Sequence, residues 1–165
     1  MSASSLLTLL AKAHPALVHA PIGAVLFLPL AILLALRSKQ HEAAWLRTSF
    51  FLASLGLLGG FASLGTGFLF ARELGGILPG QWLPHPLHPA PSFTALLRVH
   101  QLLALAGLPV GMAGWMFLIR VFKGWNTALR AAFALSILWL GLWGAAGHWG
   151  GRMVFRDPPT EDALP

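Results

Sequence analysis

The chain has no cysteine and no tyrosine among its 165 residues. Without cysteine, disulfides, thiolate chemistry, iron–sulfur ligation and a covalently attached c-type haem are all excluded. Acidic residues are nearly as scarce, and the five present all lie outside the long apolar runs: Glu42, Glu73, Asp157, Glu161 and Asp162. Within those runs, neither a carboxylate-bridged metal pair nor a carboxylate proton relay can be built.

Charge of either sign is rare along the whole sequence. Charged residues make up 10% and hydrophobic residues 56% of the chain, and the mean hydropathy is +0.72. A soluble domain carries about a quarter charged residues, so this composition predicts an integral membrane protein in a lipid bilayer. The formal net charge of +6 is then a signal of membrane topology, and we expect no nucleic-acid partner.

Four apolar runs are each long enough to cross about 30 Å of hydrocarbon at about 1.5 Å per helical residue. They cover residues 15–36, 45–71, 94–122 and 127–151. Two of the connections are short, which makes neighbouring spans antiparallel. The third connection, residues 72–93, is long and rich in proline, so it is expected as an extended cap. The predicted fold is an all-α, four-helix, up-and-down membrane bundle.

The transmembrane domain is expected to cover residues 14–156, with a polar C-terminal tail at 157–165. Residues 1–13 precede it without a basic region that would mark a signal peptide. Their apolar spacing, at Leu6, Leu9, Leu10 and Ala13, predicts a short amphipathic helix lying on the membrane surface. A frayed terminus is the alternative.

The two short connections and their flanks carry most of the basic residues and one acid, Glu42. Those basic residues are Arg37, Lys39, Arg47, Arg120, Lys123 and Arg130. Because Lys and Arg are retained on the cytoplasmic side, this end is predicted to face inward. Both termini and the proline-rich connection are then expected on the outer side.

Small and aromatic residues mark candidate packing faces. Three glycine pairs have the spacing that lets helices approach closely: Gly56 and Gly60, Gly107 and Gly111, Gly147 and Gly151. Three tryptophans lie deep in the predicted spans: Trp115, Trp139 and Trp143. These rings are interpreted as ordinary core, with the packing of a planar cofactor as the alternative.

Four histidines are predicted to share one end of the bundle. His14 and His19 open the first span in the stretch HPALVHAPIG, His100 begins the third, and His148 closes the fourth. If the helix starts before Pro21, that proline leaves the carbonyl four residues earlier without a donor and disrupts the helix. Ionisable side chains in a membrane span are costly, so they are candidates for function.

Neutral imidazole is the ligand that haem iron, copper and zinc have in common. A b-type haem needs two opposed imidazoles in an apolar slot. An internal repeat that aligns Val18-His19 with Val99-His100 favours His19 and His100 as the metal-ligating pair. His14 and His148 are then a second pair or neighbours of the haem propionates. Binding of copper or zinc, and a purely structural role in capping helix ends, are the alternatives.

The opening stretch resembles the signature HPxxVHxPIG of a bacterial membrane family called domain of unknown function 2231. His100 in VHQLLALAG and the closing GGRMVF, residues 150–155, are also similar to that family. Family members continue with an arginine and a histidine, whereas here Arg156 is followed by Asp157. The resemblance implies a four-helix protein of the bacterial cytoplasmic membrane. Some members are joined to cytochrome-like modules, which favours redox work.

The expected function is therefore a b-type haem electron-transfer protein or redox-complex subunit. Its expected partners are a membrane redox complex, or quinol together with an electron acceptor on the outer side. The alternative is a non-catalytic structural or assembly subunit of a larger membrane complex. The spans contain no set of nucleophile, base and acid, so no independent catalytic activity is expected.

Overall fold

The computed structural model describes residues 13–73 and 92–155, together with Leu6 and Leu9. The described chain forms four long helices and no strand: α2 (His19–Arg37), α3 (Glu42–Glu73), α4 (Ser92–Phe122) and α5 (Ala128–Phe155). This confirms the all-α prediction. The predicted surface helix, most of the proline-rich connection and the C-terminal tail lie outside the described residues.

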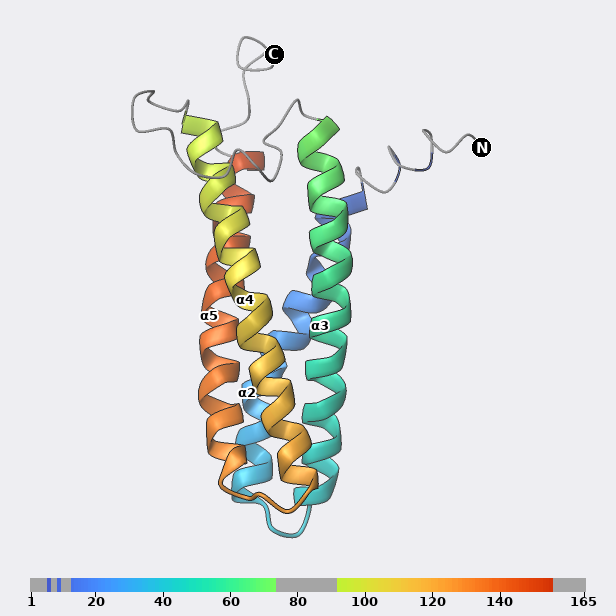
Figure 1. The fold of residues 1–165 in the computed structure, drawn as a ribbon, viewed down its shortest axis with the longest axis vertical. Helices are drawn as coiled ribbons and strands as arrows, with labels where there is room; N and C mark the ends of the chain where they lie inside the picture. Colours follow the sequence, from blue (N-terminus) through green and yellow to red (C-terminus); the bar gives the residue numbers. More distant parts are fainter. Residues whose placement is uncertain (1–5, 7–8, 10–12, 74–91, 156–165) are drawn as a thin grey trace.

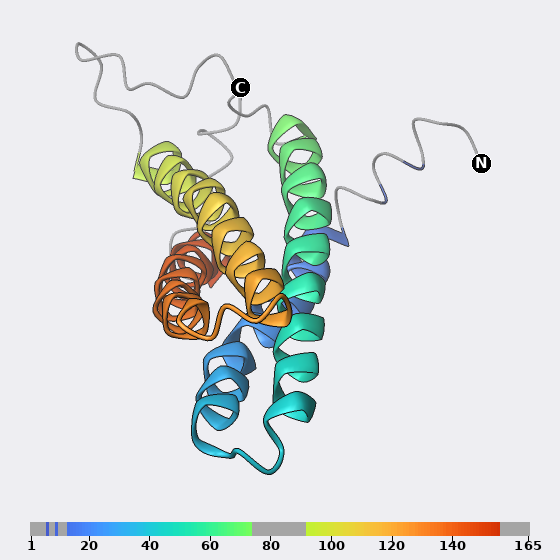
Figure 2. The same ribbon diagram turned by 60° about the horizontal axis from the view of Figure 1, so that its bottom comes forward.

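The helices run up and down in two hairpins, which we call the first hairpin (α2 and α3) and the second hairpin (α4 and α5). Helices α2 and α4 each contact α3 and α5 but not one another, so they are diagonal in the bundle. Figure 1 shows α4 in front and α2 behind. We call the end of the bundle with both short turns the turn end; it comes toward the viewer in Figure 2. The opposite end is called the terminal end.

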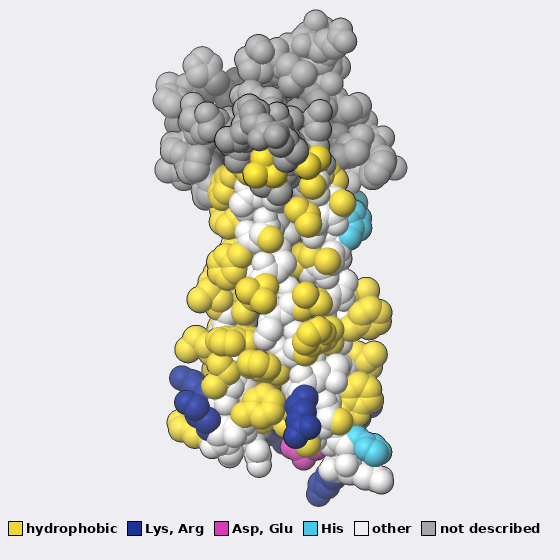
Figure 3. All heavy atoms as spheres, turned by 90° about the vertical axis from the view of Figure 1, so that its right-hand side faces the viewer, with side chains coloured by type: hydrophobic (Ala, Val, Ile, Leu, Met, Phe, Trp, Pro, Cys, Tyr) yellow, Lys and Arg dark blue, Asp and Glu magenta, His cyan; other side chains and the backbone are white. Residues whose placement is uncertain are grey.

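The outer surface of the bundle is suited to lipid. Four helices, at residues 13–37, 42–69, 96–122 and 128–152, are long and apolar enough to cross a membrane, within three residues of the predicted spans. Large apolar side chains point outward along them; Leu58 and Phe51 are 71% and 64% exposed. Figure 3 shows hydrophobic side chains along one face, with Lys and Arg gathered at the turn end. The chain is a multi-pass membrane protein.

The first transmembrane helix is interrupted at Val18. Residues 13–17 are helical and α2 begins at His19. Two backbone hydrogen bonds bridge the interruption, from Val18 N–H to the His14 carbonyl (3.1 Å) and from Ile22 N–H to the Val18 carbonyl (3.3 Å). Pro21 has no N–H for the Leu17 carbonyl between them, so the predicted disruption is confirmed. Pro21 itself is buried against α3.

The turn between α4 and α5 is closed by Gly124, whose φ is +89°. Its N–H donates to the Val121 carbonyl at 2.9 Å, and Trp125 N–H donates to the Arg120 carbonyl at 3.1 Å. This pair of bonds is the Schellman arrangement, which needs a left-handed residue that glycine adopts without strain. The short antiparallel connection between these helices therefore depends on a glycine.

Two tryptophans of α5 form the centre of the core. Trp139 and Trp143 are 1% and 6% exposed, and their rings meet edge to face with centroids 5.0 Å apart. The Trp143 Nε1–H donates to the Ala104 carbonyl of α4 at 3.2 Å. Trp115 is half-buried and donates to the Ser54 hydroxyl of α3 at 3.0 Å. The interpretation of these rings as core is confirmed.

The indoles are seated on glycines of the other helices. A Cβ added to Gly56 of α3 would lie 2.9 Å from Trp139, and one added to Gly111 of α4 would lie 2.5 Å from it. Gly60 and Gly107 leave room for Trp143 in the same way. These two glycine pairs therefore admit aromatic rings, whereas we expected them to admit neighbouring helix backbones. The third pair does not make a tight contact among the described residues, because a Cβ on Gly151 would meet none of them within 4 Å.

Substitution of Gly111 by alanine should destabilise the bundle. The new methyl group collides with Trp139, and overpacking of this kind costs about 1–3 kcal/mol, which exceeds the gain of about 0.5–1 kcal/mol from replacing glycine in a helix. Gly144→Ala is the control, since an added Cβ there has no described neighbour within 4 Å. Thermal unfolding in detergent should show a lower Tm for Gly111→Ala alone. Equal Tm values for both variants and the parent would contradict this packing.

Candidate functional site

Two imidazoles meet at the terminal end of the bundle. The rings of His14 and His100 have centroids 6.5 Å apart and planes inclined at 82°. Both side chains are half-buried. His14 belongs to the helical turn that precedes α2, and His100 belongs to α4, so the pair bridges the two hairpins. We call it the histidine pair.

The His100 ring is held by α5. Its Nδ1 lies 2.8 Å from the Ala146 carbonyl oxygen. A carbonyl can only accept a hydrogen bond, so Nδ1 carries the proton and Nε2 carries the lone pair. The ring also lies against Gly150, where an added Cβ would approach Cε1 and Nδ1 at 3.1 Å. Helix α5 therefore determines both the tautomer and the position of this imidazole.

The His14 ring is held in the corresponding way by α3. Its Nδ1 lies 3.1 Å from the Thr66 hydroxyl, which is buried. That hydroxyl also lies 3.0 Å from the Ala62 carbonyl, to which helical threonines commonly donate their proton. The His14 ring also donates a hydrogen bond to the Ser63 backbone carbonyl, so α3 holds this imidazole through two residues. A Cβ on Gly67 would approach Cε1 at 2.9 Å, so this ring too is seated on a glycine.

The two halves of the site are therefore alike. Each imidazole comes from the first helix of its hairpin and is oriented by the second helix of the same hairpin. An imidazole whose Nδ1–H is bonded to a protein oxygen, with its lone pair on Nε2, is in the state typical of a metal ligand. His100 is in that state, and the His14 ring lies beside it.

His19, which was expected to face His100, does not lie in this pair. Its side chain is exposed, and its Nδ1 lies 2.6 Å from the Pro15 carbonyl of its own helix. Five residues separate it from His14, and at 3.6 residues per turn this rotates it by about 140° around the helix. The expected pairing of His19 with His100 is thus corrected to His14 with His100.

His148 also lies on the surface. Its side chain is exposed, and its ring meets Trp149 edge to face at 5.6 Å. His41 is at the turn end, and His85 and His88 lie outside the described residues. No group of three or more His, Cys, Asp or Glu side chains suited to a metal ion occurs in the described part of the chain. The described donor set is therefore two imidazoles.

The interior below the histidine pair is closed by aromatic rings. The indoles of Trp139 and Trp143 fill the space beside the glycine pairs of α3 and α4. In α3, Gly67 lies against His14 and Gly60 lies against Trp143. The seven residues between these two glycines span about 10 Å of helix. A planar group bound to the pair is therefore confined to this layer at the terminal end, where Ala146 and Thr66 are the buried side chains nearest the imidazoles.

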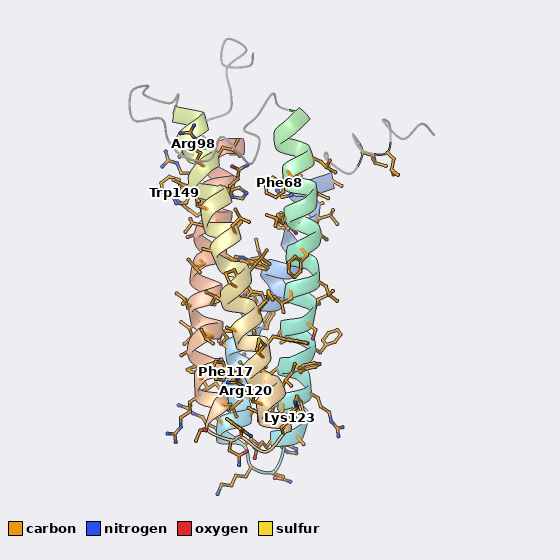
Figure 4. The ribbon with its side chains drawn as sticks, viewed as in Figure 1. Phe68, Arg98, Phe117, Arg120, Lys123 and Trp149 are labelled. Carbon is orange, nitrogen blue, oxygen red and sulfur yellow. The ribbon has the colours of Figure 1, made fainter. Side chains whose placement is uncertain are left out.

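Positively charged side chains lie at both ends of the bundle. In Figure 4, Arg98 lies near Trp149 at the terminal end, whereas Arg120 and Lys123 lie at the turn end. Arg98 is half-buried, and its Nε is buried with no hydrogen-bond partner among the described residues. The terminal end therefore has positive charge that an anionic group would neutralise.

Thr66, Gly67 and Ala146 were not recognised from the sequence. A threonine between glycines in the run GTG near the end of the second span is the signal that marked this position. Ala146 contributes only its carbonyl oxygen, which no side-chain pattern reveals. Gly150 was noted as part of the closing motif but not as the seat of a ring.

Comparisons with known proteins found no match to a family model, to a curated protein or to a solved structure. The resemblance to domain of unknown function 2231 therefore still depends on the motif residues and stays a prediction. The function is argued below from the geometry of the histidine pair.

The hydrogen bond between Thr66 and His14 can be measured without any bound metal. Thr66→Val removes the hydroxyl next to Nδ1 and should lower the free energy of unfolding by about 0.5–1.5 kcal/mol, because the half-buried imidazole loses one of its hydrogen bonds. Thr48→Val is a matched control, since Thr48 makes the same bond to the carbonyl four residues earlier but contacts no histidine. A double-mutant cycle with His14→Ala should give a coupling of about 0.5–1.5 kcal/mol. A coupling of zero would refute the bond.

Proposed function

We propose that this protein is a membrane electron-transfer protein or redox-complex subunit that binds haem b through Nε2 of His14 and Nε2 of His100. The observation that carries the proposal is the histidine pair itself. Each ring has Nδ1 next to an oxygen of its own hairpin, and the bond to the Ala146 carbonyl leaves the lone pair of His100 on Nε2. Haem iron accepts two such axial nitrogens.

The donor set favours haem over zinc. A zinc site takes three or four ligands from the protein, whereas a haem brings four nitrogens of its own and takes two. Metal–imidazole bonds of about 2.0 Å would place two opposed nitrogens about 4 Å apart. The ring centroids lie further out than the nitrogens, so a centroid separation of 6.5 Å is compatible with that arrangement.

Haem b would supply a one-electron carrier in a bundle whose apolar runs contain no acid. The chain's own contribution is to hold both imidazoles in position and to close the interior below them with Trp143. The carboxylates of a haem are anionic, and the half-buried Arg98 at the same end provides the opposite charge. Quinol in the membrane and an acceptor on the outer side are the electron partners that we propose.

A non-catalytic assembly subunit is the second candidate. Gly141 and Gly144 of α5 are exposed, and an added Cβ at either position would meet no described atom within 4 Å. Small residues on the lipid-facing side of a helix are typical of helix association. A larger membrane complex would then contact the protein along α5.

The proposed location is the bacterial cytoplasmic membrane, with the turn end in the cytoplasm. The exposed Arg37, Lys39, Arg47, Arg120, Lys123 and Arg130 support this orientation. The histidine pair would then lie in the outer leaflet, on the periplasmic side.

Absorption spectroscopy tests the haem proposal. Purified protein, as isolated or after addition of haem, should give a low-spin b-type spectrum with a sharp α band on reduction. His14→Ala and His100→Ala should each abolish or convert the spectrum, because iron loses an axial nitrogen. His19→Ala, His41→Ala and His148→Ala should retain it. A wild-type protein that stays colourless, or a His19→Ala variant that alone loses the spectrum, would refute the assignment.

Reporter fusions test the orientation. A reporter enzyme active only in the periplasm should be active when fused after Pro165 and silent when inserted at Gln40, in the turn between α2 and α3. The reverse result would move the histidine pair to the inner leaflet. Silence at both positions, with confirmed expression, would contradict the up-and-down topology across the membrane.

A further inference from the structure

Two arginines at the terminal end differ from the other basic side chains that the structure describes. All the described lysines and arginines of the turn end are exposed, whereas Arg98 of α4 and Arg152 of α5 are half-buried. Both arginines also lie within membrane-spanning segments, which begin at Leu96 in α4 and end at Arg152 in α5. A cation that is partly removed from water at this depth is costly unless an anion accompanies it.

The two arginines lie at one level of the bundle. His100 of α4 lies against Gly150 of α5, and the two helices are antiparallel. Two residues further toward the terminal end on each helix, Arg98 is therefore level with Arg152. The guanidinium carbon of Arg152 lies 5.1 Å from the centroid of the Trp149 ring. Figure 4 shows Arg98 and Trp149 in the same region of the terminal end.

Arg98 has a hydrogen-bond donor that the described chain does not use. Its Nε is buried and has no hydrogen-bond partner among the described residues. Among the side chains that the structure describes, the one carboxylate is that of Glu42, at the turn end. A guanidinium group matches an oxyanion such as phosphate, which offers several acceptor oxygens at once. The terminal end thus has the charge and the donors for an oxyanion that comes from outside the described chain.

We infer that Arg98 and Arg152 bind the phosphate of an anionic phospholipid, phosphatidylglycerol, at the terminal end. Lipid headgroups lie at the ends of membrane spans, and tryptophans such as Trp149 are enriched at the same depth. Leu102 lies one turn from Arg98 on the same side of α4 and is 54% exposed, so it offers apolar surface to an acyl chain. Phosphatidylcholine and phosphatidylethanolamine carry a cation next to the phosphate, which two guanidinium groups repel.

This lipid site shares no residue with the histidine pair and does not rest on the haem proposal. Arg98 and His100 are two residues apart on α4, which is a rotation of about 200° around the helix. A haem carboxylate is the competing occupant of Arg98, because it carries the same charge. The experiment therefore measures lipid binding both without haem and after haem has been added.

Native mass spectrometry of the full-length protein in detergent tests the inference. The probes are palmitoyl-oleoyl phosphatidylglycerol and palmitoyl-oleoyl phosphatidylcholine, which have the same acyl chains. The wild type should bind phosphatidylglycerol more tightly than phosphatidylcholine. Arg98→Gln and Arg152→Gln should each weaken the binding of phosphatidylglycerol about tenfold, because each removes a hydrogen bond between charged groups. Thermal unfolding without added lipid verifies that both variants are folded.

Arg130→Gln is the matched control, since it removes the same charge from an exposed position of the turn end and should leave the tightest lipid binding unchanged. Equal affinities of the wild type for the two lipids, or equal losses in Arg98→Gln and Arg130→Gln, would overturn the inference. Competition by millimolar inorganic phosphate would also overturn it, since a free anion would then be the ligand. So would release of the lipid on addition of haem, because Arg98 would then serve the haem carboxylates. A wild type that stays colourless with haem but retains phosphatidylglycerol through Arg98 would refute the haem proposal and uphold this one.

Discussion

The packing of the Trp139 and Trp143 indoles onto glycines is the constraint on which the rest of the structure depends. Both rings start from α5 and reach α3 and α4, so they determine how closely the second hairpin approaches the first. Four glycines make room for two rings, and a methyl group at any of them meets an indole. Interiors packed this closely do not accommodate added volume. The middle of the bundle is therefore solid, and a ligand site between the hairpins is confined to an end.

At the terminal end the packing changes in character. Between Trp143 and the terminal end, the interior of the bundle contains Thr66, Ala146 and the two imidazoles. Polar groups in a bundle surrounded by lipid must find partners inside the protein. Each imidazole finds an oxygen on the second helix of its own hairpin, at 3.1 Å for His14 and 2.8 Å for His100. Each hairpin thus orients its own histidine, and the two rings then meet between the hairpins.

Hydropathy alone predicted the four spans within three residues, because a bilayer imposes both length and apolarity on a helix. Loop length predicted that the helices joined by short turns are antiparallel. The choice between His14 and His19 was not predictable, because helical phase is uncertain next to the interruption at Val18. The glycine pairs were located correctly, but spacing does not say whether a glycine faces a backbone or an indole. The hydrogen bond from His100 to the Ala146 carbonyl was not predictable, because every residue type has a backbone carbonyl.

The stretch HPALVHAPIG acquires a physical explanation once its helix is in place. The turn before Val18 presents His14 inward to Thr66, and it also supplies the Pro15 carbonyl that holds His19 outward. Pro21 lies against Gly59 of α3, where an added Cβ would approach the proline ring at 2.9 Å. This contact holds the first membrane-spanning helix against α3 close to both histidines. Two prolines thus hold two imidazoles about 140° apart on one helix, with one in the core and one toward lipid.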